Sequence, residues 1–458
     1  TGRKSRVCTG LKEHGISFCT DSTMGRESYR IDISARSARI TAADFHGVLY
    51  AIQTIGQMLP VEYYGDTAVR DALWKLPCVT IEDAPRYHYR GMHLDVARHF
   101  FSADEVKRYL DLMSMHKMNT FHWHLTDDQG WRVEIRKYPR LIEYGSIRKQ
   151  TIVGHHNDPM HKVNGNIYDN TPYGGYYTQD EIRDVVAYAD SLGITIIPEI
   201  DMPGHMVAAL AAYPEMGCTG GPYEVRCTWA IADEALCPGK EVTFTFIEDV
   251  LTEIMELFPS EIIHIGGDEC RKQFWENCPD CQRLIRKLGL RSDSRFTKEQ
   301  YLQCYVTDRV QKFLAEHGRT LMGWDEIIEG DISKDAVVMY WRPGRSRIPA
   351  NDGFRTVMVP APYFYFNYYQ SEHLDLEPLS IGGFIPIEKT YSYEPEEEVD
   401  PEHLDKILGV QANLWTEFIS DRVNMYYNLL PRMDALSEIQ WCEKGKRDFE
   451  RFKKALVH

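Results

Sequence analysis

The chain has 458 residues, of which 43% are hydrophobic and 12% aromatic, and its formal net charge is −16. This composition supports a packed core and excludes a disordered chain. The acidic balance argues against binding of nucleic acid or of an anionic membrane surface. No run of about 20 apolar residues is present, so we expect no membrane-spanning segment. The length allows one large domain and a small one.

We expect residues 1–84 to form a small α/β domain that is incomplete at its start, because Thr1 is not an initiator residue. Apolar and polar residues alternate in SYRIDISA, residues 28–35, which predicts a half-buried strand. Residues 44–59 predict a helix that ends near Pro60.

Residues 85–458 predict eight strands that mostly alternate with helices. The strands are expected at residues 89–98, 118–128, 194–201, 261–267, 319–326, 336–341, 354–359 and 407–415. Their near-continuous apolar runs are typical of parallel strands covered on both faces. Ser102 and Thr178 each open a capping box, which predicts a helix start at both places. The pattern predicts an α/β fold of the (β/α)8 TIM-barrel type, closed by one helix over about residues 419–440.

Carboxylates and tryptophans gather where these strands end, which is where such barrels form their active sites. A tryptophan face stacks on the apolar face of a sugar ring, and carboxylates accept hydroxyl hydrogens, so the mixture suggests a sugar site. Each residue also has a plain structural explanation, such as a helix cap or a buried histidine. The combination on at least seven strand ends favours a site. The residues are Asp95, Arg98, His122, His124, Asp127, Asp128, Glu199, Asp201, His205, His264, Asp268, Glu269, Trp324, Asp325, Glu326, Trp341, Tyr365, Asn367, Trp415 and Glu417.

The stretch HIGGDEC, residues 264–270, places two carboxylates side by side. Neighbours along an extended chain point apart, so Asp268 and Glu269 should be aimed differently. Gly266 and Gly267 are expected to let the backbone turn and to leave room for a sugar.

The eleven cysteines include one CxxC pair, Cys278 and Cys281, and three cysteines in one loop, Cys218, Cys227 and Cys237. Zinc would need two more well-placed ligands beside the CxxC pair. The sequence therefore favours a local disulfide or plain thiols, with no metal site and no cofactor.

Six motifs carry a family resemblance: GMHLDVARHF, FHWHLTDDQGW, IPEIDMPGH, HIGGDE, GWDE and QANLWTE. In this order they resemble glycoside hydrolase family 20, the β-N-acetylhexosaminidases, and the bacterial members most. The resemblance covers about residues 86–441, and residues 1–84 resemble part of the small domain that precedes the barrel. It implies an exo-acting retaining glycosidase that removes a terminal β-linked N-acetylhexosamine, with the substrate's acetamido oxygen as nucleophile and an oxazolinium intermediate.

The resemblance also implies residue roles. Glu269 would be the acid/base, Asp268 would orient the acetamide, and Tyr365 would hydrogen-bond the acetamide oxygen. The implied substrate-binding residues are Arg98, Asp127, Asp201, His205, Trp324, Trp341, Asn367, Trp415 and Glu417. It implies no cofactor, a glycan as partner, and export from a bacterial cell to the periplasm or surface.

One position departs from the family pattern, because Asn367 stands where an aspartate is usual. Our hypothesis is tolerance of an anionic group on the sugar, such as a 6-sulfate, and the alternative is a neutral isosteric replacement. Two rival functions also stay open. His122 and His124 lie on one strand face, as in metal-dependent barrel hydrolases, and a catalytically inactive glycan-binding barrel would also explain the tryptophans. The sequence does not distinguish GlcNAc from GalNAc, nor give the oligomeric state.

Overall fold

A computed structural model describes residues 15–65, 67, 69, 72–155 and 157–457. The start of the predicted N-terminal domain, residues 1–14, lies outside the described residues. In the described part, strands β1 (Gly15–Thr20), β2 (Tyr29–Ile33), β3 (Ser37–Ala42) and β4 (Val79–Asp83) form a sheet of order β1-β3-β2-β4. Helix α1 (Phe45–Gln57) contacts β2 and β3, and Asp44 caps its N-terminus. The predicted strand and helix are confirmed, whereas β1, β3 and β4 were not predicted.

Eight parallel strands form the closed barrel that the sequence predicts. They are β5 (Tyr89–Asp95), β6 (Thr120–His124), β11 (Thr195–Glu199), β12 (Ile262–His264), β13 (Thr320–Trp324), β14 (Val337–Tyr340), β15 (Arg355–Met358) and β16 (Ile407–Ala412). Each strand pairs with the next in chain order, and β16 closes on β5. Each lies within a stretch predicted as a strand, so the fold class is confirmed.

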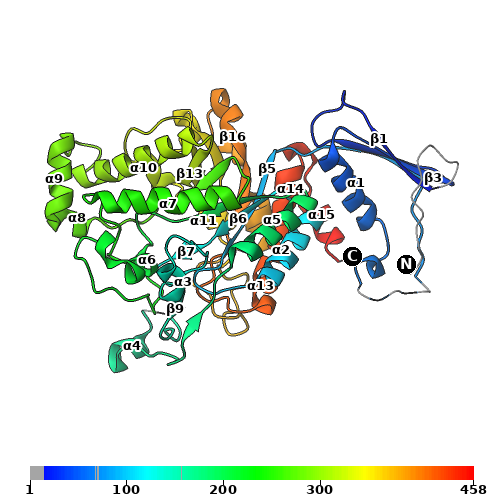
Figure 1. Cartoon of the computed structure of the whole chain (residues 1–458). Helices are drawn as coiled ribbons and strands as arrows, with labels where there is room; N and C mark the ends of the chain where they lie inside the picture. The colour runs from blue at the N-terminus through cyan, green and yellow to red at the C-terminus, as the bar shows by residue number, and fades with distance from the viewer. Residues whose placement is uncertain (1–14, 66, 68, 70–71, 156, 458) are drawn as a thin grey trace.

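Long helices cover the barrel on its outer side (Figure 1). They are α2 (Ala103–Met115), α5 (Gln179–Ser191), α7 (Glu241–Leu257), α10 (Lys298–Glu316) and α14 (Arg432–Trp441). The two predicted capping boxes are present, from Ser102 to Glu105 and from Thr178 to Glu181. The shorter helices are α3 (Arg140–Glu143), α4 (Pro159–Asn164), α6 (Val207–Ala212), α8 (Gln273–Asn277), α9 (Pro279–Leu288), α11 (Ala361–Phe364), α12 (Ile387–Ser392), α13 (Arg422–Leu429) and α15 (Phe449–Ala455).

The single helix predicted over residues 419–440 is wrong. Helix α13 ends at Leu429 and α14 begins at Arg432, with Pro431 between them. Proline has no backbone N–H and its ring clashes with the preceding turn, so an α-helix does not continue through it. The chain turns there.

A buried ion pair joins the small N-terminal sheet to the barrel. Arg90 on β5 contacts Glu27 at 3.2 Å, and both side chains are at most 2% exposed. The Arg90 guanidinium also donates to the Tyr50 hydroxyl on α1 at 2.6 Å. The N-terminal unit is therefore fixed to the amino-terminal half of β5. No helix in the described part of the chain is long and apolar enough to cross a bilayer.

Candidate active site

A cavity of about 310 Å³ lies at the carboxyl ends of the barrel strands. Its lining residues are Arg98, His205, Asp268, Glu269, Trp341, Tyr365, Asn367, Tyr368, Ile381, Gly382, Gly383, Trp415 and Glu417. Nine of the twelve predicted site residues are among them. The other three, Asp127, Asp201 and Trp324, lie beneath this lining and are at most 1% exposed.

The segment that carries the two carboxylates is not extended. Strand β12 ends at His264, Gly266 and Gly267 have φ of 65° and 96°, and Glu269 has a φ of 48°. A left-handed conformation at a glutamate costs free energy and is concentrated at functional sites. The expectation that Asp268 and Glu269 point apart because they lie on an extended chain is therefore wrong in its reason.

The two glycines do let the backbone turn, as expected, but the room they leave is not for a sugar. A Cβ at Gly266 would overlap the Asp201 carboxylate, and a Cβ at Gly267 would lie 2.6 Å from Cγ2 of Ile327. Both positions are therefore filled by the protein's own side chains. The Gly267 backbone N–H donates to Asp201 at 3.3 Å, which ties the turn to the end of β11.

His205 stands beside both carboxylates. Its Nε2 is 3.6 Å from Oδ2 of Asp268 and 3.7 Å from Oε2 of Glu269. On the other edge of the ring, Nδ1 is 3.1 Å from Oδ1 of Asp127. Burial alone would lower the pKa of His205, but Asp127 raises it well above its usual value. A protonated imidazole therefore bridges Asp127 to the carboxylate pair.

The two carboxylates differ in their access to solvent. The Asp268 side chain is 12% exposed and that of Glu269 is 32% exposed. Burial raises the pKa of Asp268 to about 6. The positive charge of His205 lowers this pKa, and the negative charge of Glu269 raises it further. Asp268 is thus a buried carboxylate whose Oδ1 has no hydrogen-bond partner among the described residues. The Glu269 carboxylate is partly open to solvent.

Aromatic rings line the same cavity as these acids. Trp341 and Tyr365 are stacked, with ring centroids 5.9 Å apart and an interplanar angle of 8°. The Trp415 ring lies 6.2 Å from Tyr365, and the Arg98 guanidinium lies over it at 5.3 Å. Burial, and then the charge of Asp268, raises the pKa of Tyr365 well above its usual value, so its hydroxyl stays protonated and can donate.

Polar groups also line the cavity. Arg98 contacts Asp95 at 3.1 Å, Asp127 at 2.8 Å and Gln129 at 2.8 Å, which fixes its guanidinium. Burial raises the pKa of Glu417 to about 7 although the charge of Arg98 opposes this. The buried Oδ1 of Asn367 and Oε2 of Glu417 have no hydrogen-bond partner among the described residues. Such unpaired buried acceptors favour a ligand with hydroxyl donors.

Beneath the cavity floor, Glu199 is surrounded by three histidines and Trp324. It is 2.5 Å from Nδ1 of His124, 2.9 Å from Nε2 of His122 and 3.0 Å from Nδ1 of His264. The indole N–H of Trp324 donates to it at 2.9 Å. Trp324 therefore supports the floor, and its ring lies 5.8 Å from Trp415, which does line the cavity.

These histidines have the composition of a metal site, and most of their ring nitrogens face a protein partner, whereas Nε2 of His264 has no hydrogen-bond partner among the described residues. The two ring nitrogens of His124 face Glu199 and, at 2.9 Å, Asp127. Nδ1 of His264 accepts from the Gly266 N–H at 3.0 Å, and Nδ1 of His122 lies 3.0 Å from the Gln411 amide. Burial alone would raise the pKa of Glu199, but His124, His264 and His122 hold it well below its usual value. The histidines and Glu199 therefore form a buried network in which the carboxylate stays ionised.

Several lining residues were not predicted. Tyr368, Ile381, Gly382 and Gly383 come from the chain between β15 and β16, which the sequence left unassigned. Glu326 was noted at a strand end but not placed in the site, and it accepts the indole N–H of Trp341 at 3.0 Å. The aromatic run around Tyr365 was the available signal for Tyr368.

A parallel (β/α)8 barrel whose mouth combines paired carboxylates with tryptophan and tyrosine rings is typical of the glycoside hydrolases. The comparison with known families agrees. The profile of glycosyl hydrolase family 20, catalytic domain, matches residues 87–444, and that of glycosyl hydrolase family 20, domain 2, matches residues 3–84. The chain belongs to glycosyl hydrolase family 20.

Individual relatives are similar over nearly the whole chain. A beta-hexosaminidase of Porphyromonas gingivalis is 40% identical over 96% of this chain and 54% of its own length. A beta-hexosaminidase of Vibrio furnissii is 36% identical over 91% of this chain and 66% of its own length. The crystal structure of the GH20 exo beta-N-acetylglucosaminidase from Vibrio harveyi, in complex with N-acetylglucosamine, has a TM-score of 0.82 and 35% identity, covering 96% of this chain and 67% of that one. The chain thus spans between half and two thirds of the length of these relatives.

Proposed function

We propose that the protein is an exo-acting, retaining β-N-acetylhexosaminidase that removes a terminal N-acetylhexosamine by substrate-assisted catalysis. The observation that carries the proposal is the pair Asp268 and Glu269 beside His205, facing the Tyr365 hydroxyl and the Trp341 and Trp415 rings in one small cavity. A cavity of about 310 Å³ is at the lower end of small-ligand sites, which favours one sugar ring over a chain. The ligand named for the Vibrio harveyi relative, N-acetylglucosamine, is such a ring.

The different surroundings of the two carboxylates support different roles. Glu269, the more exposed, protonates the leaving oxygen and then takes a proton from water. Asp268, buried and ionised above about pH 6, accepts the acetamide N–H and stabilises the positive charge that develops on that nitrogen. The protonated Tyr365 hydroxyl donates to the acetamide oxygen, which attacks the anomeric carbon. Neither carboxylate needs to attack the sugar.

The remaining lining residues hold the sugar. Arg98, fixed by its carboxylate partners, donates to ring hydroxyls, and Glu417 and Asn367 accept from them. Trp341 and Trp415 pack on the acetamide and the apolar face of the ring. Asp127, Asp201 and Trp324 act through these residues, because they lie beneath the cavity and contact His205, Gly267 and Glu199.

A second cavity, of about 440 Å³, adjoins the first through Ile381 and is the proposed place of the aglycone. Trp229 and Phe418 line it, with ring centroids 6.2 Å apart, and Phe418 follows Glu417 directly. Replacement of Trp229 by alanine should raise KM for N-acetylchitooligosaccharides. KM for p-nitrophenyl N-acetyl-β-glucosaminide, whose aglycone is one small ring, should change less. Equal increases in KM for the two substrates would mean that the aglycone binds elsewhere.

The proposed activity is tested by release of p-nitrophenol from the β-N-acetylglucosaminide, the β-N-acetylgalactosaminide and the plain β-glucoside. We expect turnover of one or both acetamido sugars and none of the glucoside. Turnover of the plain β-glucoside that disappears on chelation and returns with a divalent metal would favour the metal-dependent hydrolase, which needs no acetamido group. Binding of the sugars without turnover would favour the inactive glycan-binding barrel.

We further propose that Asn367 allows an anionic substituent near O4 or O6 of the sugar. Its position in the cavity lining, in the same pocket as Glu417, supports this, because a neutral amide lowers the local negative charge. The neutral alternative is a replacement without effect on specificity. The ratio of kcat/KM for 6-sulfated and unsulfated aryl glycosides, measured for Asn367→Asp and the parent, separates the two.

The proposed substrates are glycans of surfaces and secretions, and on that ground we propose export to the periplasm or the cell surface. The support is the substrate class alone. Fractionation of cells that express the complete gene tests the proposed export, with a cytoplasmic marker protein as control. Recovery of the enzyme in the same fraction as this marker would contradict export.

A further inference from the structure

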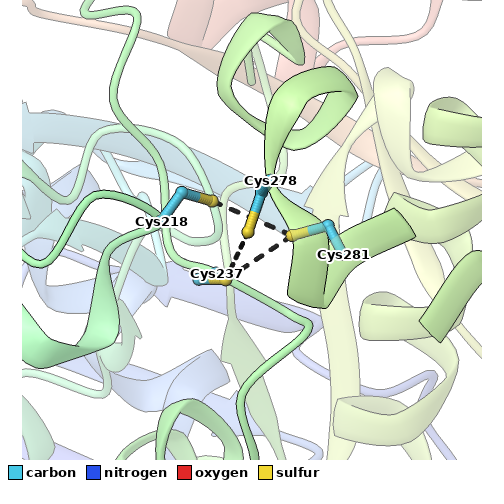
Figure 2. A group of neighbouring side chains, drawn as sticks. All are labelled: Cys218, Cys237, Cys278 and Cys281. Atoms are coloured by element: carbon cyan, nitrogen blue, oxygen red, sulfur yellow. Dashed lines mark hydrogen bonds between the residues drawn. The ribbon is translucent and has the colours of Figure 1, made fainter. Parts of the chain in front are cut away.

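We propose that Cys218, Cys237, Cys278 and Cys281 bind one structural zinc ion (Figure 2). The Sγ atom of Cys237 is 3.6 Å from that of Cys278 and 3.5 Å from that of Cys281, and the Sγ atoms of Cys218 and Cys281 are 3.8 Å apart. All four sulfurs lie within 4.8 Å of one another. Figure 2 shows the four side chains pointing toward a common centre.

These separations fit a tetrahedral metal site and not a disulfide. Four sulfurs placed about 2.3 Å from a tetrahedral zinc are about 3.8 Å apart from one another. The sulfurs of a disulfide are about 2.05 Å apart, and the four cysteines are free. The sequence favoured a disulfide or plain thiols because its CxxC pair lacked two further ligands. The fold supplies them from a loop that lies 41 to 63 residues earlier in the chain.

Two separate segments present the ligands. Cys218 and Cys237 lie in the loop that follows α6, whereas Cys278 is the N-cap of α9 and Cys281 lies in its first turn. Gly239 allows the loop to reach this helix end, since a Cβ there would overlap the backbone at Asp280 and Cys281. The close approach brings Cys237 beside the CxxC pair.

The surroundings suit buried thiolates that bind a metal. Cys237, Cys278 and Cys281 are buried and Cys218 is partly exposed. The side chains of Trp275, Ile285 and Leu302 pack around the cluster. An all-sulfur set selects zinc or iron over magnesium and calcium, which prefer oxygen. Since four cysteines fill a tetrahedral zinc shell, they leave no open position for catalysis, and the proposed role is structural.

The cluster is linked to the candidate active site through the backbone. The Leu236 N–H donates to the Pro203 carbonyl at 2.9 Å, and the Trp275 indole donates to the Leu236 carbonyl at 2.9 Å. Pro203 lies two residues before His205, and Cys270, the residue after Glu269, packs in the same apolar cluster. Zinc would therefore hold the 213–240 loop against the segments that carry His205 and the carboxylate pair.

Metal analysis of the purified full-length chain is the test. Without added metal during purification and after desalting, we expect about one zinc per chain by inductively coupled plasma mass spectrometry. Cys237→Ser and Cys281→Ser should lose the zinc and lower Tm. Cys227→Ser is the matched control, because Cys227 lies in the same loop outside the four-cysteine cluster, and it should keep the full amount.

A second measurement decides the matter if the serine variants do not fold. Wild-type protein exchanged with cobalt should show the thiolate charge-transfer band and the visible bands of a tetrahedral cobalt site. An oxidising compartment would favour disulfides, so alkylation in denaturant without reductant, followed by mass spectrometry, counts the thiols. Absence of metal with four free thiols, or with two disulfides among these cysteines, overturns the proposal. One iron per chain overturns the assignment to zinc.

Discussion

The pH dependence of kcat/KM reports on Asp268, which the proposed mechanism needs in its ionised form. Burial raises its pKa to about 6 from an ordinary value of 3.8, a difference of about 3 kcal/mol between its protonation states. Ionised Asp268 is lost as the pH falls through that value. We therefore expect the fraction of ionised Asp268, and with it the acid limb of kcat/KM, to fall about tenfold between pH 7 and pH 5.

Removal of the His205 charge should move this acid limb to higher pH. The imidazole Nε2 is 3.6 Å from the Asp268 carboxylate. A unit charge at that distance contributes about 1 kcal/mol even with the full screening of water, which corresponds to about one pH unit. The limb in His205→Gln should thus lie at least about one unit above that of the parent.

The assay is the initial rate of p-nitrophenol release at low substrate concentration, by stopped samples from pH 4 to 9. Glu417 titrates in the same range, because burial raises its pKa to about 7. The pH profile of Glu417→Gln separates the titration of Asp268 from that of Glu417, and the acid limb near pH 6 should remain in this variant. An acid limb near pH 4 in the parent, or no shift in His205→Gln, would refute the electrostatic argument.

Three further predictions concern single side chains. Glu269→Gln should lower kcat/KM by about 10²–10⁴-fold on N,N′-diacetylchitobiose and less on an aryl glycoside, whose leaving group needs less protonation, and equal losses would argue against general acid catalysis. Glu27→Ala leaves the buried Arg90 unpaired and should cost about 3–5 kcal/mol in urea unfolding, whereas Glu82→Ala at an exposed pair should change little. Asn367→Asp should lower the preference for 6-sulfated over unsulfated glycosides, and an unchanged ratio would leave the neutral explanation.

The barrel was predictable because its signals are local. Each barrel strand is a mostly buried run of three to seven residues, and two of the long helices begin with a capping box that is visible in the sequence. Strand β1 was missed since its apolar Ile16 and Phe18 are exposed, whereas the alternation in β3, with Ala38, Ile40 and Ala42 buried, was available and was overlooked. The helix end at Leu429 was available from Pro431 and was overlooked.

The site was predictable as a set of residues but not as a geometry. Motifs identified nine residues that line the cavity, because strand ends of a closed barrel converge wherever the strands are known. The use of Gly266 and Gly267 to make room for Asp201 and Ile327 depends on tertiary contacts that no local pattern encodes. The same holds for the cysteine cluster, whose ligands lie on segments far apart in the sequence.

The central claim is that the acetamido oxygen of the substrate is the nucleophile. A series of substrates that differ only in the acyl group on nitrogen tests this claim most directly. The measurement is kcat/KM for p-nitrophenyl β-glucosaminides that carry acetyl, fluoroacetyl, difluoroacetyl and trifluoroacetyl groups on nitrogen. Each fluorine withdraws electron density from the amide oxygen, the proposed nucleophile, so kcat/KM should fall steeply and steadily along the series. A rate that is independent of fluorination would show that an enzyme group or water attacks the sugar, and would contradict the roles given to Asp268 and Tyr365.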